Sequence, residues 1–526
     1  MSKVLVSDPI DQAGIDILSQ VATVDVKTNL KPEELVQIIG DYDALMIRSG
    51  TRVTKEIIEA GTQLKIIGRA GVGVDNVDVP AATRKGIVVV NSPEGNTIAA
   101  AEHALAMMLS LSRYIPDANA SVKRGEWDRK SFIGAEVYKK TLGVIGLGKI
   151  GSHVATVAKA MGMKLLAYDP FISTERAEQI GCQLVELDLL VQQADYITLH
   201  MPKTPETTHL IDAKMLAKMK PTARIVNCAR GGIIDEEALA VALKEGQIAG
   251  AALDVFESEP LGESSLRALG KEIILTPHLG ASTTEAQVNV AIDVAEQIRD
   301  VLLGLPARSA VNIPGLGPDI LEELKPYMQL AETLGKLVGR LAGGRVELLN
   351  VRLQGELATN KSQPLVIASL KGLLYQALRE RVNYVNATLE AKERGIRVIE
   401  TRDAAIKDYA GSLHLEATGS LGTHSVTGAL LGDGEIRLTN IDGFPVNVPP
   451  SQHMLFTLHR DMPGIIGKLG SLLGSFNVNI ASMQVGRKIV RGDAVMVLSL
   501  DDPLPEGILS EIKKVAGIRD AYTVTL

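Results

Sequence analysis

Residues 141–169, TLGVIGLGKIGSHVATVAKAMGMKLLAYD, decide the fold of this chain. An apolar run enters the pattern Gly146-x-Gly148-x-x-Gly151, a helical stretch follows, and a second apolar run ends at Asp169. In a dinucleotide-binding unit such glycines make the tight turn, admit the pyrophosphate to the backbone and let the helix pack close to the strand. The terminal carboxylate accepts hydrogen bonds from the ribose and repels the extra phosphate of NADP. The segment therefore predicts a Rossmann-type domain that binds NAD.

A glycine-rich turn without any ligand is the alternative, because this glycine pattern alone is a weak signal. Here the strand, the helix and the terminal Asp169 all occur at the expected places. The dinucleotide interpretation is therefore favoured.

Length and composition restrict the class of protein. The chain has 526 residues, which corresponds to about three or four domains. Its net charge is -7, from 55 Lys and Arg against 62 Asp and Glu, which disfavours a nucleic acid or an anionic membrane as partner. Cys182 and Cys228 are the two cysteines, too few for a disulfide framework or a metal cluster. No signal peptide or membrane span is recognisable, so a cytoplasmic enzyme without a metal is expected.

Alternating strands and helices fill the first half of the chain. Apolar strands such as KVLVSD and GIVVVN alternate with helical stretches over residues 3–92, and the pattern resumes after residue 100. This order is typical of parallel sheets flanked by helices. We expect an α/β protein with two doubly wound domains, a substrate domain (1–98 plus 284–310) and an NAD domain (99–283). An amphipathic helix from Thr283 to Leu303 returns the chain to the first domain, and the Gly/Pro-rich residues 303–318 are a predicted linker.

Two further modules follow the predicted dehydrogenase half. Residues 311–450 have a helical start and then β-rich, glycine-punctuated sequence, which predicts an intervening α+β domain without a recognisable catalytic constellation. Residues 451–526 have the order β-α-β-β-α-β of a ferredoxin-like fold. Such a small module usually binds a ligand or pairs with itself.

Three polar residues are candidates for the chemistry, because they follow predicted strands of the NAD domain, where open α/β sheets place ligands. Arg230 offers a fork-shaped cation for the carboxylate of a 2-hydroxy acid. His278 suits a general base for the hydroxyl proton. Glu259 would stabilise the imidazolium and fix the tautomer of the ring. The alternatives are a surface ion pair for Arg230 and Glu259 and a capping role for His278.

The segments NCARGGIIDEEAL, LDVFESEP and LTPHLGAST resemble the signatures of the D-isomer-specific 2-hydroxyacid dehydrogenases. This resemblance covers residues 1 to about 310 and implies that Arg230, Glu259 and His278 are the catalytic residues. The whole chain is similar to the long members of that family, which oxidise 3-phospho-D-glycerate with NAD at the start of the phosphorylated route to serine. The resemblance further implies these cofactor contacts: Gly146, Gly148, Lys149, Ile150, Gly151, Asp169, Thr207, Cys228, Ala229, Arg230, Asp254, His278, Gly280 and Ala281.

A phosphorylated substrate requires converging cations. The resemblance implies that 3-phosphoglycerate is held by Arg48, Arg69, Asn96 and Arg129, with Arg129 reaching a neighbouring subunit's site. A solvated surface cation is the alternative for each arginine. His103 is expected on a helix surface or in a dimer interface, since no second metal ligand accompanies it in the sequence. Cys228 is expected to be a small buried residue and not a nucleophile.

The segments HRDMPGIIGKL and NVNIASM resemble the effector face of ACT domains that sense amino acids. Asp461 would take an amino group, Asn479 would bind both ends of a small amino acid, and the helix after Pro463 would favour its carboxylate. L-serine, the pathway product, is the expected effector, bound between subunits of a homo-oligomer, with a tetramer expected. His459 faces the same loop. A purely structural module is the alternative.

Two rival functions stay open at this point. A hydroxypyruvate or glyoxylate reductase would share the catalytic residues but would not need Arg48 and Arg69 to face a phosphate. A non-enzymatic NAD-sensing regulator could be built on the same fold, although the two C-terminal modules argue against it.

Overall fold

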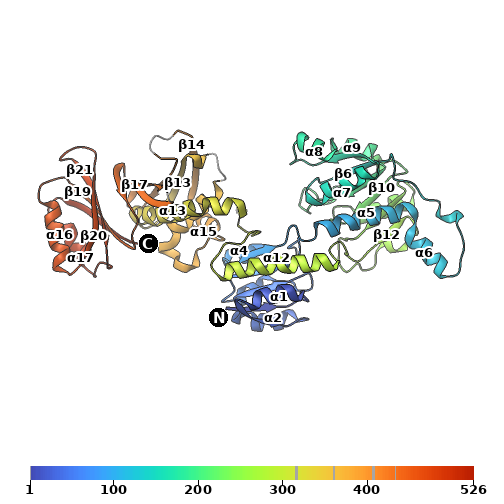
Figure 1. The fold of residues 1–526 in the computed structure, drawn as a ribbon, viewed down its shortest axis with the longest axis horizontal. Helices are drawn as coiled ribbons and strands as arrows, with labels where there is room; N and C mark the ends of the chain where they lie inside the picture. Colours follow the sequence, from blue (N-terminus) through green and yellow to red (C-terminus); the bar gives the residue numbers. More distant parts are fainter. Residues whose placement is uncertain (1, 314–317, 359–361, 406–408, 433) are drawn as a thin grey trace.

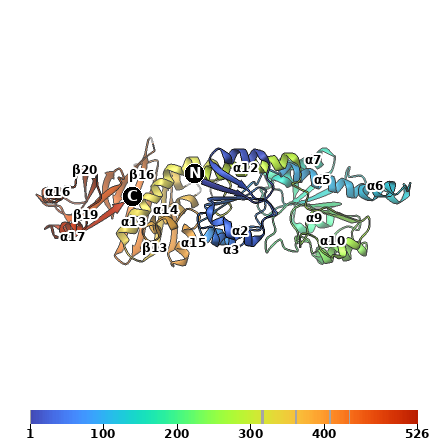
Figure 2. The ribbon, with the colours of Figure 1, turned by 90° about the horizontal axis from the view of Figure 1, so that it is seen from below.

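A computed structural model describes residues 2–313, 318–358, 362–405, 409–432 and 434–526. The molecule is elongated, with its parts in a row (Figure 1, Figure 2). The C-terminal module lies at one end and the dinucleotide domain at the other, with the intervening domain and the N-terminal domain between them. Four separate sheets build these parts.

The N-terminal domain has a parallel five-stranded sheet of order β2-β1-β3-β4-β5. Valine, isoleucine and leucine fill its strands because both faces are covered by helices. Its strands are β1 (Ser2–Val6), β2 (Ala22–Val26), β3 (Ala44–Ile47), β4 (Ile66–Arg69) and β5 (Val88–Asn91). Its helices are α1 (Gln12–Ser19), α2 (Pro32–Ile38), η1 (Ile39–Asp41), α3 (Lys55–Ala60) and α4 (Val79–Arg84).

Two long helices join this domain to the next (Figure 1). Helix α5 (Thr97–Arg113) carries the chain out, and α12 (Thr284–Leu302) brings it back to pack on β4. The side chain of Thr283 caps α12 by accepting from the amide of Ala286 at 3.1 Å, so the predicted start of this helix is confirmed. Its buried face includes Val290 and Val294, whereas Val288 and Ile292 are only partly buried.

The second domain has a seven-stranded parallel sheet of order β12-β11-β10-β9-β6-β7-β8. The strand order reverses between β6 and β9, and such a switch point is where doubly wound sheets bind their ligands. Its strands are β6 (Thr141–Ile145), β7 (Lys164–Tyr168), β8 (Gln183–Leu184), β9 (Tyr196–Leu199), β10 (Arg224–Asn227), β11 (Gly250–Leu253) and β12 (Ile273–Leu275). Its further helices are α6 (Ile115–Lys123), η2 (Lys130–Phe132), α7 (Lys149–Ala160), α8 (Thr174–Ile180), α9 (Leu187–Gln193), α10 (Ala213–Lys218), α11 (Glu236–Lys244) and η3 (Ser265–Ala268).

The segment after α12 was predicted as a linker and is partly bound to the first domain. Ala310 bridges to Val90, and the side chain of Asn312 accepts from the amide of Val89 at 2.9 Å. Residues 314–317 of this segment lie outside the described residues.

The intervening domain packs a six-stranded mixed sheet on two long helices. Its helices are α13 (Pro318–Ala342), η4 (Glu356–Ala358), α14 (Gln363–Leu378), η5 (Arg379–Arg381) and α15 (Ala387–Glu393). Its strands are β13 (Val346–Gly355), β14 (Arg397–Asp403), β15 (Gly411–Gly419), β16 (Gly422–Leu431), β17 (Glu435–Ile441) and β18 (Phe444–Val448). The predicted helical start and β-rich remainder are present.

The C-terminal module has the predicted β-α-β-β-α-β order and an antiparallel sheet of order β20-β21-β19-β22. One face of that sheet shares a core with the intervening domain, through residues such as Phe444, Val446, Met454 and Val497. Its elements are β19 (His453–Arg460), α16 (Ile465–Ser475), β20 (Ile480–Arg487), β21 (Asp493–Leu500), α17 (Ile508–Lys514) and β22 (Ile518–Thr525).

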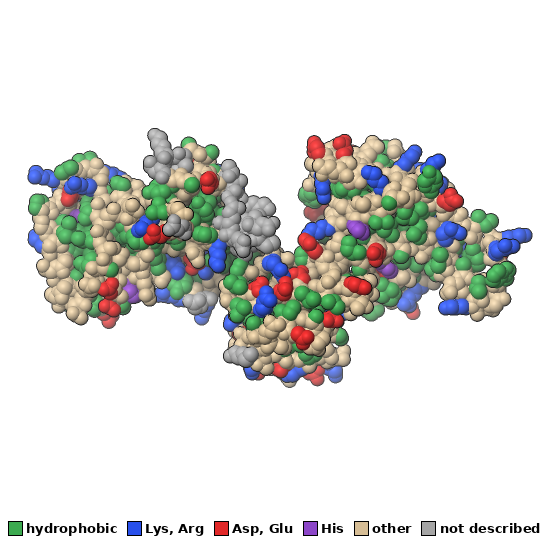
Figure 3. Space-filling model, viewed as in Figure 1, with side chains coloured by type: hydrophobic (Ala, Val, Ile, Leu, Met, Phe, Trp, Pro, Cys, Tyr) green, Lys and Arg blue, Asp and Glu red, His purple; other side chains and the backbone are tan. Residues whose placement is uncertain are grey.

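The four sheets confirm the predicted fold class, two parallel α/β sheets followed by an α+β domain and a ferredoxin-like module. On the face shown in Figure 3, acidic and basic side chains are interspersed without a continuous basic stripe. Within the described residues, every helix is too short or too polar to cross a bilayer.

Candidate active site

The turn between β6 and α7 has the geometry that a pyrophosphate requires. Gly146 has φ +91° and lies against the carbonyl of His200, so a side chain there would be strained and would clash. Gly151 packs on the carbonyl of Gly146, which brings helix α7 close to the strand. A Cβ on Gly148 would meet open space, so the backbone there is accessible to a ligand. The backbone amides at the start of α7 can therefore donate hydrogen bonds to a bound anion.

Asp169 lies directly after β7, as the sequence predicts. Its Oδ2 accepts from the amide of Leu147 at 2.8 Å, and its Oδ1 accepts from the amide of Phe171 at 2.9 Å. These bonds fix the carboxylate beside the glycine turn, where it can meet a ribose. Lys149, at the first position of α7, forms an ion pair with Glu94 of the N-terminal domain.

The His278 ring is held by a carboxylate. Nδ1 of His278 lies 2.7 Å from Oε2 of Glu259, and Oε1 of Glu259 accepts from the amide of Phe256 at 3.1 Å. Both side chains are partly exposed, 47% for His278 and 37% for Glu259, so a substrate can reach the pair. His278 has φ +55°, a left-handed conformation that a non-glycine residue adopts only when its surroundings impose it.

Three arginines gather opposite this pair. Arg48 directly follows strand β3, Arg69 ends strand β4, and Arg230 follows β10. Burial, followed by the neighbouring charge of Arg230, lowers the pKa of Arg69 to about 10. The Nε atom of Arg69 is buried without a hydrogen-bond partner among the described residues. Arg230 lies 3.3 Å from Oδ2 of Asp75, its acidic partner here. Asp75 and the buried Asp8 offset part of this positive charge, and the guanidinium groups of Arg48 and Arg69 offer donors that suit an anion.

A cavity of about 760 Å³ brings the predicted residues together. Its wall combines the N-terminal domain with the loops after β11 and β12, and includes Arg48, Arg69, Glu259 and His278. Four further polar residues of this wall were not predicted from the sequence: Ser49, Arg267, Thr276 and Ser282. Ser49 follows Arg48 directly and could have been found from the strand end, whereas Arg267 lies in a 3-10 turn that carries no motif.

Two predicted substrate contacts lie outside that wall. Asn96 precedes α5, and its Oδ1 is buried without a partner among the described residues. Arg129 is exposed on the arm that follows α6, so within one chain it does not join Arg48 and Arg69.

The other predicted cofactor contacts lie on loops around the switch point. Thr207 fixes the loop after β9, with Oγ1 donating to the carbonyl of Pro202 at 2.8 Å. Cys228 and Ala229 follow β10, Ile150 lies in the first turn of α7, and Gly280 and Ala281 follow His278. Asp254 ends β11 and is fully buried.

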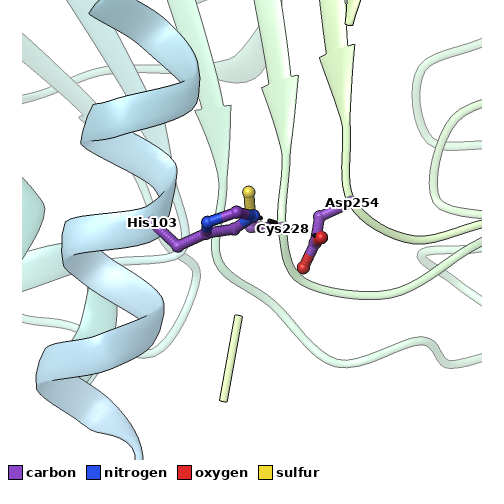
Figure 4. Close-up of side chains that lie close together, drawn as sticks. All are labelled: His103, Cys228 and Asp254. Carbon is purple, nitrogen blue, oxygen red and sulfur yellow. Dashed lines mark ion pairs between the residues drawn. The ribbon is translucent and has the colours of Figure 1, made fainter. Parts of the chain in front are cut away.

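Figure 4 shows His103 on α5 pointing toward Cys228 and Asp254. Ligand atoms of the three side chains lie within 4.8 Å of one another. The premise that no second ligand type accompanies His103 is therefore wrong, whereas its location on a helix surface or in a dimer interface stays a prediction. Burial raises the pKa of the Cys228 thiol, which opposes the thiolate that a metal prefers. Asp254 already accepts several hydrogen bonds, so the arrangement favours a hydrogen-bonded cluster over a metal centre.

The predicted effector residues do not meet within one chain. Asp461 follows β19, where Arg487 donates to it at 2.9 Å and lowers the pKa of its carboxyl. Asn479 precedes β20 and donates to Asp501 at 2.6 Å. Because β19 and β20 are both antiparallel to β21, these two positions lie at opposite ends of the sheet. A cavity of about 540 Å³ is lined by Asp461, Arg487 and the buried His459, without Asn479.

Comparisons with known proteins agree with this geometry. Residues 105–280 match the family model described as D-isomer specific 2-hydroxyacid dehydrogenase, NAD binding domain. Residues 323–442 match the D-3-phosphoglycerate dehydrogenase intervening domain, and residues 453–517 match the ACT domain. The matched NAD-binding family confirms the cofactor predicted from residues 141–169.

Relatives match over the full length. The chain is 76% identical to a D-3-phosphoglycerate dehydrogenase of Synechocystis sp., covering 100% of this chain and 95% of the relative. It is 48% identical to one from Methanocaldococcus jannaschii, covering 100% of both. A solved D-lactate dehydrogenase of Aquifex aeolicus in complex with NAD and lactic acid is 27% identical with a TM-score of 0.52, covering 58% of this chain and 96% of that one. The chain belongs to the D-isomer-specific 2-hydroxyacid dehydrogenase family, and within it to the D-3-phosphoglycerate dehydrogenases.

Proposed function

We propose that this chain oxidises 3-phospho-D-glycerate to 3-phosphohydroxypyruvate with NAD, the first step of the phosphorylated route to L-serine, in the cytoplasm. The observation that carries the proposal is that Arg48, Arg69 and the His278–Glu259 pair line one cavity. When bound, NAD would supply the hydride acceptor. The names of the full-length relatives support the same substrate.

His278 and Glu259 of the cavity wall and Arg230, which lies close to Arg69, divide the work. Arg230 binds the substrate carboxylate through its guanidinium fork. His278 accepts the C2 hydroxyl proton on Nε2, since Nδ1 is already engaged by Glu259. Glu259 then stabilises the imidazolium that forms. Loss of the hydroxyl proton and of the C2 hydride leaves a ketone, so the atoms and charges balance.

The phosphate of the substrate needs its own cations. Arg48 and Arg69 line the cavity from the N-terminal domain, across from His278. Arg69 is largely buried and lacks a partner for Nε among the described residues, so a phosphate oxygen would complete its hydrogen bonding. In the proposed substrate site Asn96 lies nearby, and Arg129 serves the site of a neighbouring subunit.

Activity assays with 3-phosphoglycerate, glycolate and D-lactate test the proposal. We expect a specificity constant for 3-phosphoglycerate far above the other two, because their lack of a phosphate leaves two arginines unpaired. Comparable rates with all three substrates, or a preference for glycolate, would favour a reductase of small 2-keto acids. Inactivity on every 2-hydroxy acid together with tight NAD binding would favour a sensor.

We also propose that the chain forms a homo-oligomer, a tetramer. The arm after α6 exposes large apolar side chains, 81% of Trp127 and 79% of Ile133, which a second copy would cover. We further propose that the domains of one chain are divided where the sequence predicts, at 98/99, 283/284, 310/311 and 450/451. Sedimentation velocity would test the state, and a concentration-independent monomer would contradict it.

L-serine is the proposed effector of the ACT domain, bound between subunits. Asp461 and Asn479 lie at opposite ends of one module, and a two-fold related copy set antiparallel would place Asn479 of the partner subunit near Asp461. Serine would have to compete with Arg487 for the Asp461 carboxylate. Calorimetry at millimolar serine tests this proposal: absence of heat would leave the module as an assembly element.

A further inference from the structure

His103 lies on α5, the helix that links the two domains, and its ring reaches the end of strand β11 (Figure 4). Nε2 of His103 is 3.1 Å from Oδ1 of Asp254 and 3.4 Å from Oγ1 of Thr276. The His103 side chain is 19% exposed and the Asp254 side chain 0%. The contact is therefore shielded from water, where a hydrogen bond to a carboxylate is stronger than at the surface.

Asp254 in turn organises the loop that carries His278. Its Oδ1 accepts from the amide of Leu279 at 2.7 Å and from the hydroxyl of Thr276 at 2.6 Å. Its Oδ2 accepts from the amide of Gly280 at 2.8 Å, and its backbone carbonyl accepts from the amide of His278 at 2.9 Å. Asp254 thus accepts hydrogen bonds from Thr276, His278, Leu279 and Gly280. His278 donates through its backbone amide, so its side chain stays free of Asp254.

This loop needs such support because His278 has φ +55°. A non-glycine residue in that region carries backbone strain and persists only when its surroundings hold it there. The hydrogen bonds that the Asp254 carboxylate accepts from this loop supply much of that support. Burial alone raises the pKa of Asp254, but hydrogen bonds from His103, Thr276 and Leu279 outweigh burial and keep its pKa below the ordinary value.

His103 differs from the other groups that donate hydrogen bonds to the Asp254 carboxylate, because it lies outside the His278 loop. Thr276, Leu279 and Gly280 belong to the loop itself, so their bonds move with it. His103 belongs to a separate helix that packs on α7 and on strand β10. Its bond therefore ties the loop to the body of the domain, and specifically to the helix that enters from the N-terminal domain.

We propose that His103 is a positioning residue, whose Nε2 donates to Asp254 and thereby holds the His278 loop in its reactive geometry. The inference rests on the proposed function, because it assigns His103 a role in the proton transfer by His278. Displacement of a catalytic group by about 1 Å costs up to about a hundredfold in rate, while binding contacts elsewhere are retained.

The test compares two amide substitutions at one position. The amide nitrogen of glutamine can reach the place of Nε2, whereas that of asparagine ends near the place of Nδ1 and falls short of Asp254. We expect H103N to lower kcat about tenfold or more, with KM for 3-phosphoglycerate within about twofold of wild type. We expect H103Q to restore most of kcat. E102Q, at the exposed neighbouring position of α5, is the matched control and should keep wild-type values.

Equal kcat in H103N and H103Q, at either level, would overturn the proposal, because only one of them can donate to Asp254. A raised KM for NAD with unchanged kcat would also overturn it and would make the cluster a cofactor contact. Should H103N not fold, H103M takes its place in the comparison, since it fills the space without a donor. If the wild type prefers another 2-hydroxy acid, the same ratio is measured with that substrate, so this test is separate from the test of the proposed function.

Discussion

Nδ1 of His278 lies 2.7 Å from a carboxylate oxygen of Glu259, and the second oxygen of that carboxylate is fixed by the amide of Phe256. Both ends of Glu259 are thus engaged, which fixes the orientation of the imidazole. Nε2 becomes the ring nitrogen that is free to exchange a proton with a substrate in the cavity. The contact between His278 and Glu259 therefore determines which ring nitrogen acts as the base. It also determines what substitutions of these two residues should change.

Replacing His278 with alanine removes the base. We expect kcat for 3-phosphoglycerate to fall on the order of a hundredfold or more, since general base catalysis contributes about 10²–10⁴. Affinity for NADH, measured by fluorescence titration, should stay within about threefold because the dinucleotide turn is untouched. Full activity of H278A would exclude the assignment.

Glu259→Gln keeps the shape of the side chain and removes its charge. The neutral amide stabilises the imidazolium less, so kcat should fall about tenfold to a hundredfold while the unfolding temperature changes little. Steady-state kinetics and thermal unfolding of the same preparation check the prediction. Glu257, a nearby exposed carboxylate that pairs with His209, provides a matched control through E257Q. If E259Q and E257Q behave alike, Glu259 has only a structural role.

The dinucleotide domain could be predicted from residues 141–169 because its signals are local. A turn without room for a side chain at Gly146 and Gly151, a helix start and a carboxylate directly after the next strand all follow one another in sequence. The catalytic pair was predicted from residue types and a family resemblance, and their distance of 2.7 Å could come only from the structure. The environment of His103 could not be predicted, because Cys228 and Asp254 come directly after strands β10 and β11, far along the chain from α5.

Arg69→Met tests how the substrate's phosphate is recognised. Removal of the largely buried guanidinium should raise KM for 3-phosphoglycerate about tenfold to a hundredfold, because a charge-assisted hydrogen bond contributes about 1.5–3 kcal/mol. The rate with unphosphorylated D-glycerate should change much less. R52M, at an arginine outside the cavity wall, controls for lost surface charge. An equal loss with both substrates would assign Arg69 to the fold.

Acid should weaken the NAD domain through His200. Burial lowers the pKa of His200 to about 4, against the ordinary value of 6.5, so the folded chain resists a proton that the unfolded chain takes up. The related stability is fully present above pH 6.5 and is lost as the pH falls from 6.5 toward 4, by about 2 kcal/mol at pH 5. H200Q should therefore lose less stability between pH 7 and pH 5, measured by urea unfolding. Parallel losses in both proteins would show that other groups dominate.

For the effector site, the sequence predicted the two motifs but not how they are placed relative to one another. The motif around Asp461 and the motif around Asn479 were each found, and their placement at opposite ends of the sheet follows from the antiparallel register of β21 with both neighbours. A motif specifies a loop, whereas pairing order decides which loops meet. The ACT module and the intervening domain share a core that the sequence did not predict. The sequence of each one alone has the pattern of a separate amphipathic unit.

Asp169 should decide between NAD and NADP. Its carboxylate lies beside the glycine turn, bound to the amides of Leu147 and Phe171, and its negative charge opposes a 2′-phosphate. D169A should lower the ratio of the NAD to the NADP specificity constant about tenfold or more, through loss of both the ribose contact and the repulsion. D169N keeps one acceptor oxygen, which can serve the amide of either Leu147 or Phe171, and removes the charge, so it tests the electrostatic repulsion with less loss of support for the turn than D169A. We expect D169N to gain NADP activity while it keeps most of its NAD activity. If both variants lose NAD activity and neither gains NADP activity, Asp169 acts on the turn alone, and NAD selection lies elsewhere in the site.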